Sequence, residues 1–146
     1  MTRNMECEKF MGVVSIIRAR FPTLRTELIA EHPHVGTMLE IPEQEGLIFS
    51  VSINLQNCDE LHLNAGSFWC EWYPCRKSEV CGRFAEAVCG LLSGEYRIVE
   101  YWRSGVALKA NLERPVENSW LRVASWSRLH IPVSWGVRTK ILQNVS

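Results

Sequence analysis

Two stretches of the chain place apolar residues at spacings of three and four, the pattern of an amphipathic helix. The first stretch covers residues 6–31. A proline inside a helix removes a hydrogen bond and clashes with the preceding turn, so Pro22 should kink this helix or split it in two. The second stretch begins at Ser78, a residue type that caps helices, and closes at Ser93 and Gly94. The sequence therefore predicts two helical regions.

Between these regions the apolar residues recur with a period of two, which is typical of β-strands. Three such runs follow one another, separated by turn-forming residues at 42–46 and 56–59. Within the third run the apolar phase slips by one residue across Gly66 and Ser67, and a β-bulge would explain the slip. We expect an antiparallel meander with one covered face.

The chain after the second helical region predicts two or three further strands. Ser104 and Gly105 form a two-residue connection between alternating runs, which is the signature of a tight hairpin. Residues 120–127 alternate again and should form a strand. Residues 133–145 fit the period of a strand and that of a helix, and the pattern does not decide between them.

The order of these elements indicates an α+β fold, because no β-α-β alternation forces a parallel sheet. We expect a single globular domain over residues 1–146, with one mainly antiparallel sheet of five to seven strands and two helices packed on it. The order of helix, three strands, helix and two strands resembles that of type III secretion chaperones. This resemblance concerns architecture, which by itself does not imply function.

Composition narrows the classes of protein that the chain can belong to. Hydrophobic residues make up 47% of the sequence, but no apolar run approaches the roughly 20 residues that cross a bilayer. The N-terminus carries no signal-peptide cleavage site, so we expect a cytoplasmic protein with its six cysteines reduced. The 16 basic and 16 acidic residues cancel, which argues against nucleic acid as the partner.

A thiol nucleophile is one candidate for chemistry. Cys75 precedes the second predicted helix and is followed by Arg76 and Lys77, and both a helix N-terminus and nearby cations lower a thiol pKa. His62 would be the base. The alternative is a loop cysteine and a strand histidine that never meet, and the cysteine spacings do not match a Cys-x-x-Cys redox pair.

Metal and acid-base chemistry have weaker patterns. The soft ligands that zinc prefers occur in the same region without the paired close spacing of a structural site, at Cys58, His62, Cys70 and Cys75. Carboxylates such as Glu60 and Glu71 lie on or beside the meander, where acidic residues usually solvate turns and edges. We therefore predict no metal, no cofactor and no catalytic residue.

Aromatic residues give the strongest hint of a binding surface. Trp69 and Tyr73 fall on the face opposite Trp72, and further tryptophans recur on the later strands together with basic residues. Either helices cover both faces of the sheet and bury these rings, or some rings form an exposed patch of the kind that marks a partner site. The binding candidates are Trp69, Tyr73, Trp102 and Arg122.

The function expected from these patterns is protein-protein interaction without catalytic activity, as in an adaptor or chaperone-like protein. The partner would be another protein or a second copy of the chain. The alternative is a small-molecule-binding protein or enzyme with a pocket between the second helix and the sheet, with Cys75, His62 or Glu71 at its mouth.

Overall fold

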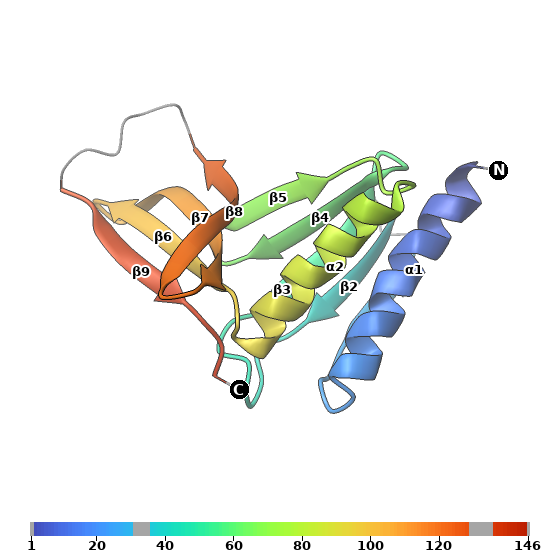
Figure 1. Cartoon of the computed structure of the whole chain (residues 1–146), viewed down its shortest axis with the longest axis horizontal. Coiled ribbons are helices and arrows are strands. Elements are labelled where there is room, and N and C mark those ends of the chain that lie inside the picture. The colour runs from blue at the N-terminus through green and yellow to red at the C-terminus, as the bar shows by residue number, and fades with distance from the viewer. Residues whose placement is uncertain (1, 31–35, 129–135, 146) are drawn as a thin grey trace.

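The computed structural model describes residues 2–30, 36–128 and 136–145 (Figure 1). The elements run in the order α1 (Thr2–Arg20), β1 (Glu27–Ala30), β2 (Thr37–Ile41), β3 (Val51–Gln56), β4 (Glu60–Ala65), β5 (Phe68–Trp72), α2 (Ser78–Ser93), β6 (Arg97–Arg103), β7 (Val106–Val116), β8 (Ser119–Ser127) and β9 (Arg138–Leu142). The described strands form two antiparallel sheets, ordered β1-β2-β3-β4-β5 and β8-β7-β6-β9. The predicted α+β class and antiparallel pairing are confirmed. The single sheet is wrong.

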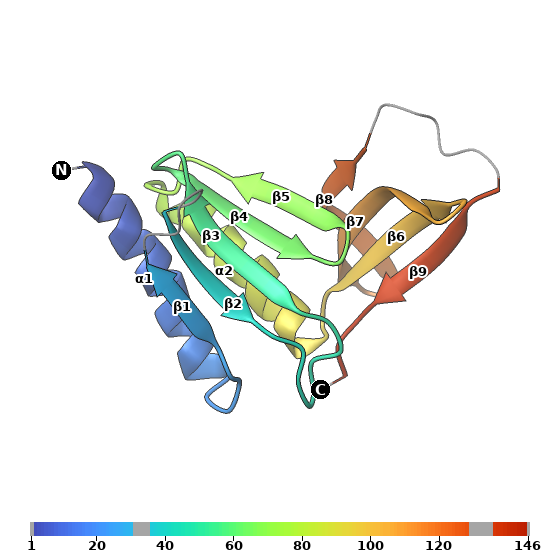
Figure 2. The ribbon, with the colours of Figure 1, turned by 180° about the vertical axis from the view of Figure 1, so that it is seen from behind.

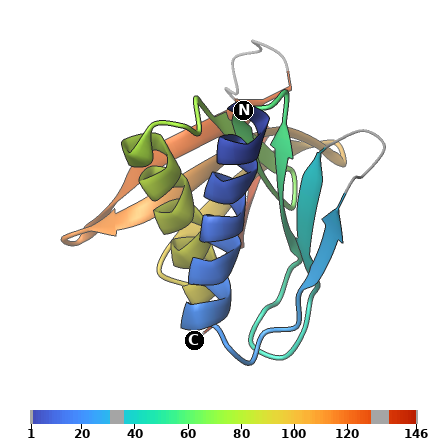
Figure 3. The same ribbon diagram turned by 90° about the vertical axis from the view of Figure 1, so that its right-hand side faces the viewer.

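The first sheet has both helices on one face. Figure 2 shows the sheet in front of α1 and α2, and Figure 3 shows the two helices side by side against it. The main core fills the space between these layers. Its largest fully buried side chains include Phe10 and Ile17 of α1, Phe84 and Leu91 of α2, and Ile53 and Leu63 of the sheet.

The first helix is shorter than its sequence pattern suggests. The α conformation is disfavoured for a residue that precedes proline, and α1 indeed ends at Arg20, two residues before Pro22. The apolar positions beyond it belong to other structure: Leu28 lies in β1 and pairs with Leu39 of β2. The prediction of a helix over residues 6–31 was therefore wrong for residues 21–30, and residue 31 lies outside the described ranges.

The phase slip in the third predicted strand is a turn and not a bulge. Gly66 and Ser67 connect β4 to β5, so four strands and not three occupy residues 37–72. Gly66 has φ 57°, the positive value that a type II′ turn requires at its first central residue. Ala65 and Phe68 pair directly across this turn, so both face the core although they are three positions apart. A two-residue hairpin thus produces the same slip as a bulge.

The strands after α2 form a second sheet of their own. Both edges of β6 are occupied, by β7 on one side and β9 on the other, so β6 has no free edge with which to join the first sheet. A period-two pattern indicates which face of a strand is apolar, but it does not indicate which other strand pairs with it, so it could not predict two sheets. The two sheets meet at the β4–β5 turn. There the backbone N–H of Ser67 donates to Oε2 of Glu100 at 2.7 Å, and the Ser67 hydroxyl donates to the same oxygen. Glu100 is only 2% exposed.

The predicted hairpin at Ser104 and Gly105 is confirmed, with φ 50° and 76° at these residues, as a type I′ turn requires. The strand predicted at 120–127 is β8. For residues 133–145, the described part contains the strand β9, while residues 129–135 lie outside the described ranges.

The second helix matches its predicted bounds, with one difference at its start. Ser78 is the first helical residue, and the cap position is Lys77, whose side chain makes no capping hydrogen bond. At the other end Gly94 closes the helix with φ 83°. Asn144 secures this end: its Nδ2 donates to the Leu91 carbonyl at 3.1 Å, and its Oδ1 accepts from the Ile48 N–H at 2.8 Å.

Among the described residues, no helix has the length and apolar character to cross a membrane.

Candidate functional site

The face of the first sheet that lies away from the helices carries a polar cluster. Strand register places Asn54, His62 and Glu71 opposite one another on β3, β4 and β5. Glu60 precedes His62 by two residues and therefore points to the same side of β4. His62 is only 2% exposed, whereas Glu71 remains 43% exposed at the sheet edge. The imidazole is thus buried within a group of polar neighbours.

Each ring nitrogen of His62 has a defined partner. Nε2 lies 3.1 Å from Oε2 of Glu60 and 3.7 Å from Oε2 of Glu71, while Nδ1 accepts from the indole N–H of Trp69 at 3.1 Å. An indole nitrogen is only a donor, so Nδ1 must present its lone pair and a neutral ring carries its proton on Nε2. This network assigns the tautomer of His62 and directs its N–H at the carboxylates.

The Glu60 carboxylate is stabilised in its charged form. Asn57 Nδ2 donates to its Oε2 at 2.7 Å, and His62 shares the same oxygen. The hydrogen bond from Asn57, followed by that from His62, lowers the pKa of Glu60 below its ordinary value of 4.5. Glu60 is therefore an anion at neutral pH.

Strand β5 is an edge strand of the first sheet. In a two-residue hairpin the pair next to the turn is hydrogen-bonded and the pairs then alternate, so Phe68, Cys70 and Trp72 bond to β4. The backbone N–H and C=O groups of Trp69 and Glu71 consequently point away from β4. Apart from a 3.7 Å contact of Cys70 Sγ with the Glu71 carbonyl, no hydrogen bond to them is found within the described part of the chain.

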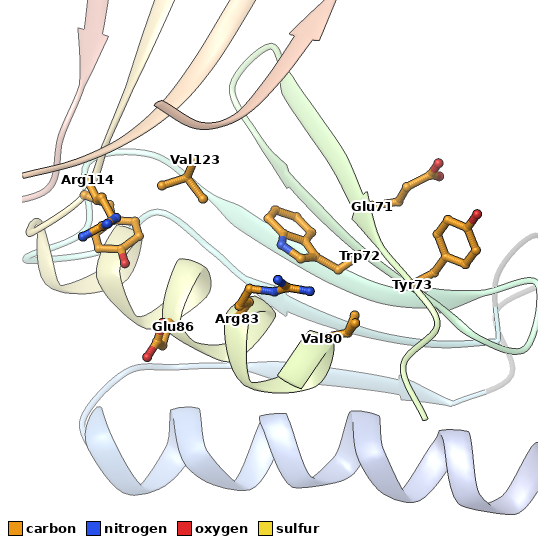
Figure 4. A pocket seen from close by; sticks show the side chains of 9 residues that line it. Glu71, Trp72, Tyr73, Val80, Arg83, Glu86, Arg114 and Val123 are labelled. Carbon is orange, nitrogen blue, oxygen red and sulfur yellow. The ribbon is translucent and has the colours of Figure 1, made fainter. Parts of the chain in front are cut away.

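A groove of about 730 Å³ runs beside this edge (Figure 4). It is lined by Glu71, Trp72 and Tyr73 from the end of β5, by Val80, Arg83 and Glu86 from α2, and by Tyr96, Arg114 and Val123 from the second sheet and its entry. Successive side chains of a strand point to opposite faces. Glu71 and Trp72 are the last two residues of β5, and Tyr73 follows directly, so a groove lined by all three opens along the edge of the strand at its C-terminal end, next to the outward backbone groups of Glu71.

The groove has aromatic side chains on one wall and two arginines in its lining. Trp72 packs edge-on against Phe84 of α2, with ring centroids 5.5 Å apart, which fixes its position. Figure 4 shows the Arg83 guanidinium below this indole. Neither Arg83 nor Arg114 has an ion-pair partner within 4 Å in the described ranges. Burial raises the pKa of Tyr96, so its hydroxyl stays protonated. These groups suit a ligand with both apolar and anionic parts.

The thiol candidate lies apart from this groove. Cys75 is 0% exposed, and its backbone N–H donates to the Asp59 carbonyl at 2.9 Å. Burial raises the pKa of the thiols of Cys70, Cys81 and Cys89, so none of these three is an activated thiolate. The arrangement expected of an accessible nucleophile, an exposed thiol near a base, is not formed by Cys75.

Three of the four predicted binding residues lie on strands β5, β6 and β8, and Tyr73 directly follows the end of β5. Trp69 and Tyr73 are the exposed aromatics of the β5 region, at 41% and 62% exposure, and Tyr73 lines the groove. Trp102 is half-buried on β6, where its indole N–H donates to Glu100 at 3.4 Å. Arg122 is exposed on β8 opposite Glu113. The structure therefore brings Trp69 and Tyr73 to one region and places Trp102 beside Glu100 on β6.

Arg83, Arg114 and Tyr96 also line the groove, although they were not predicted from the sequence. A usable signal existed for Arg83, which follows Val80 by three residues and so borders the apolar face of α2. For Arg114 and Tyr96 no local pattern indicates a shared groove.

No protein-family model, curated protein or solved structure matches this chain.

Proposed function

We propose that this protein binds an extended segment of another polypeptide in the groove between β5, α2 and the second sheet. The segment adds to the first sheet as a strand beside β5. The observation that carries this proposal is the lining of the groove by Glu71, Trp72 and Tyr73, since an opening along a strand edge exposes main-chain donors and acceptors.

Edge strands that pair with other chains obtain affinity from the backbone and specificity from side chains. Here the outward N–H and C=O groups of Glu71 at the groove, and those of Trp69 further along the same edge, supply the backbone contacts. The side chains of Trp72 and Tyr73 supply apolar surface, and Arg83 and Arg114 supply positive charge that lacks an ion-pair partner in the described structure. The lining also contains Glu71 and Glu86, so the complementary partner segment has apolar residues facing Trp72 and Tyr73 and acidic residues only where it meets Arg83 and Arg114.

The runner-up function is the binding of a small molecule in the same groove. Its volume of about 730 Å³ favours this alternative, because ligand pockets commonly enclose about 300–1,000 Å³. The mixed lining of two arginines, two glutamates and three aromatics fits a peptide at least as well. An activated cysteine is not part of either proposal, because Cys75 is buried.

The test is selection of peptides from a random display library on the purified protein, followed by anisotropy titration of labelled peptides. Arg83→Glu and Arg114→Glu should weaken binding about tenfold or more, while Arg122→Glu, the same change at an exposed site outside the groove, should leave it within about twofold. Equal weakening by all three variants would contradict the groove as the binding site.

A second measurement distinguishes strand addition from other modes. N-methylation of the selected peptide at one amide at a time removes one backbone donor at each position. Because only alternate residues of an added strand bond to β5, affinity should fall at every second position. A uniform tolerance of N-methylation would refute strand addition, and failure to select any peptide together with a small-molecule hit in the groove would favour the runner-up.

A further inference from the structure

The polar cluster on the outer face of the first sheet contains three side chains with metal-binding atoms. Nε2 of His62, a carboxylate oxygen of Glu60 and one of Glu71 all lie within 4.8 Å of one another. Nε2 lies 3.1 Å from the Glu60 oxygen and 3.7 Å from the Glu71 oxygen. In a zinc site with bonds of about 2.0–2.2 Å, neighbouring ligand atoms are about 3.3 Å apart, so small rotations of the carboxylates suffice.

The backbone holds these groups in place. His62 and Glu71 are direct partners across β4 and β5, and Glu60 stands two positions before His62 on the same face. This differs from a solvated acidic surface, because a buried imidazole stands between the carboxylates and directs one nitrogen at both. From this geometry we propose that Glu60, His62 and Glu71 form a binding site for a divalent transition-metal ion such as Zn²⁺.

The ligand set selects the class of ion. An imidazole nitrogen with two carboxylates suits zinc and similar transition metals, whereas Mg²⁺ and Ca²⁺ take oxygen ligands. The ion replaces the proton that Nε2 shares with the carboxylates. Glu71 is 43% exposed, so water completes the coordination from the solvent side. The site is distinct from the groove, although Glu71 borders both.

Trp69 is coupled to this site through the tautomer of His62. Metal binding requires the lone pair of Nε2, so the ring proton must move to Nδ1, where the Trp69 indole N–H now donates. Two donors cannot face each other. Trp69 therefore has to leave Nδ1 when the metal binds, and its 41% exposure leaves it room to do so. A metal-bound histidine then directs its Nδ1–H to water or another acceptor.

The experiment uses the full chain with Cys58→Ser, which removes an exposed thiol that would bind zinc by itself. Titration with ZnCl₂ is followed by calorimetry and by tryptophan fluorescence, with MgCl₂ as the comparison. We expect one equivalent of Zn²⁺ to bind with micromolar or better affinity and to change the fluorescence. Mg²⁺ should do neither.

Variants separate this site from adventitious binding. Glu71→Gln and His62→Gln each alter a proposed ligand, so each should weaken Zn²⁺ binding by at least the roughly 10–100-fold that loss of a ligand's own hydrogen-bond partner costs. Glu40→Gln is the matched control, because Glu40 accepts from Ser52 on the same face at 3.2 Å and is not a ligand. Circular dichroism verifies that each variant is folded.

Trp69→Phe gives the most specific result. It removes the competing hydrogen bond, so Zn²⁺ should bind as tightly or more tightly while most of the fluorescence change disappears. The proposal is overturned if no stoichiometric Zn²⁺ binding occurs at millimolar concentration, or if binding is unchanged in His62→Gln. A folded Trp69→Phe variant that loses binding would also contradict it.

Discussion

The contact between Ser67 and Glu100 connects the two sheets, and we expect it to contribute substantially to the free energy of unfolding. The Ser67 hydroxyl donates to a carboxylate that is 2% exposed, and a hydrogen bond to a charged group contributes about 1.5–3 kcal/mol. Ser67→Ala removes this donor but keeps the backbone N–H contact at 2.7 Å. We expect the free energy of unfolding to fall by about 2 kcal/mol, which corresponds to roughly 4–8 °C in Tm for a domain of this size.

The assay is urea unfolding at pH 7, monitored by circular dichroism and by tryptophan fluorescence. Ser52→Ala is the matched control, since Ser52 donates to Glu40 at 3.2 Å in a more exposed position, where the expected loss is below about 1 kcal/mol. A double-mutant cycle with Glu100→Gln should give a coupling energy of about 1 kcal/mol or more. If Ser67→Ala costs no more than Ser52→Ala, or if the cycle is additive, the reasoning is wrong.

Three further predictions concern a helix end, the thiols and pH. Gly94→Ala should lower the free energy of unfolding by more than about 1 kcal/mol, measured by thermal unfolding, because φ is 83° and a Cβ would meet the Asn144 carbonyl. A thiol reagent should label the exposed Cys58 quickly and Cys75 only after denaturation, and equal rates would contradict the burial of Cys75. Because the pKa of Glu60 is lowered by folding, its stabilising effect should be complete above pH about 4.5 and lost as pH falls through the lowered value. Glu60→Gln should therefore reduce the difference in stability between pH about 6 and about 3, and an unchanged difference would count against this assignment.

Local sequence patterns were sufficient to predict those elements whose structure depends on local interactions. The helix at 78–93 follows from a broad apolar face that ends at a glycine, and the hairpin at Ser104 and Gly105 follows from a two-residue connection between alternating runs. The end of α1 was also available from Pro22, although the apolar spacing continued past it.

The division into two sheets depends on long-range pairing that no local pattern encodes. Strand β9 pairs with β6, far away in sequence, and thereby closes the second sheet. The groove is equally hard to predict from the sequence, because its lining combines residues of β5, α2, β7 and β8. Arg83 and Arg114 could therefore not be assigned to one groove before these elements were placed.

The polar cluster around His62 could more nearly have been predicted from the sequence than the groove. His62 and Glu71 are both candidates for chemistry in the sequence, but a bulge at Gly66 and Ser67 leaves their register undefined. A two-residue turn at the same position makes Ala65 and Phe68 partners, and counting back three pairs places His62 opposite Glu71. The choice between turn and bulge therefore decided whether the cluster was visible.

The order of strands has a consequence for how the chain reaches this structure. In the first sheet every strand pairs with its neighbour in sequence, so its hairpins close short loops at small entropic cost. The β6–β9 pairing is the exception, because Ile98 must find Leu142 across the intervening hairpins. We therefore expect β9 to be the last strand to dock during folding, and its amides to exchange with solvent through openings that leave β6 and β7 paired.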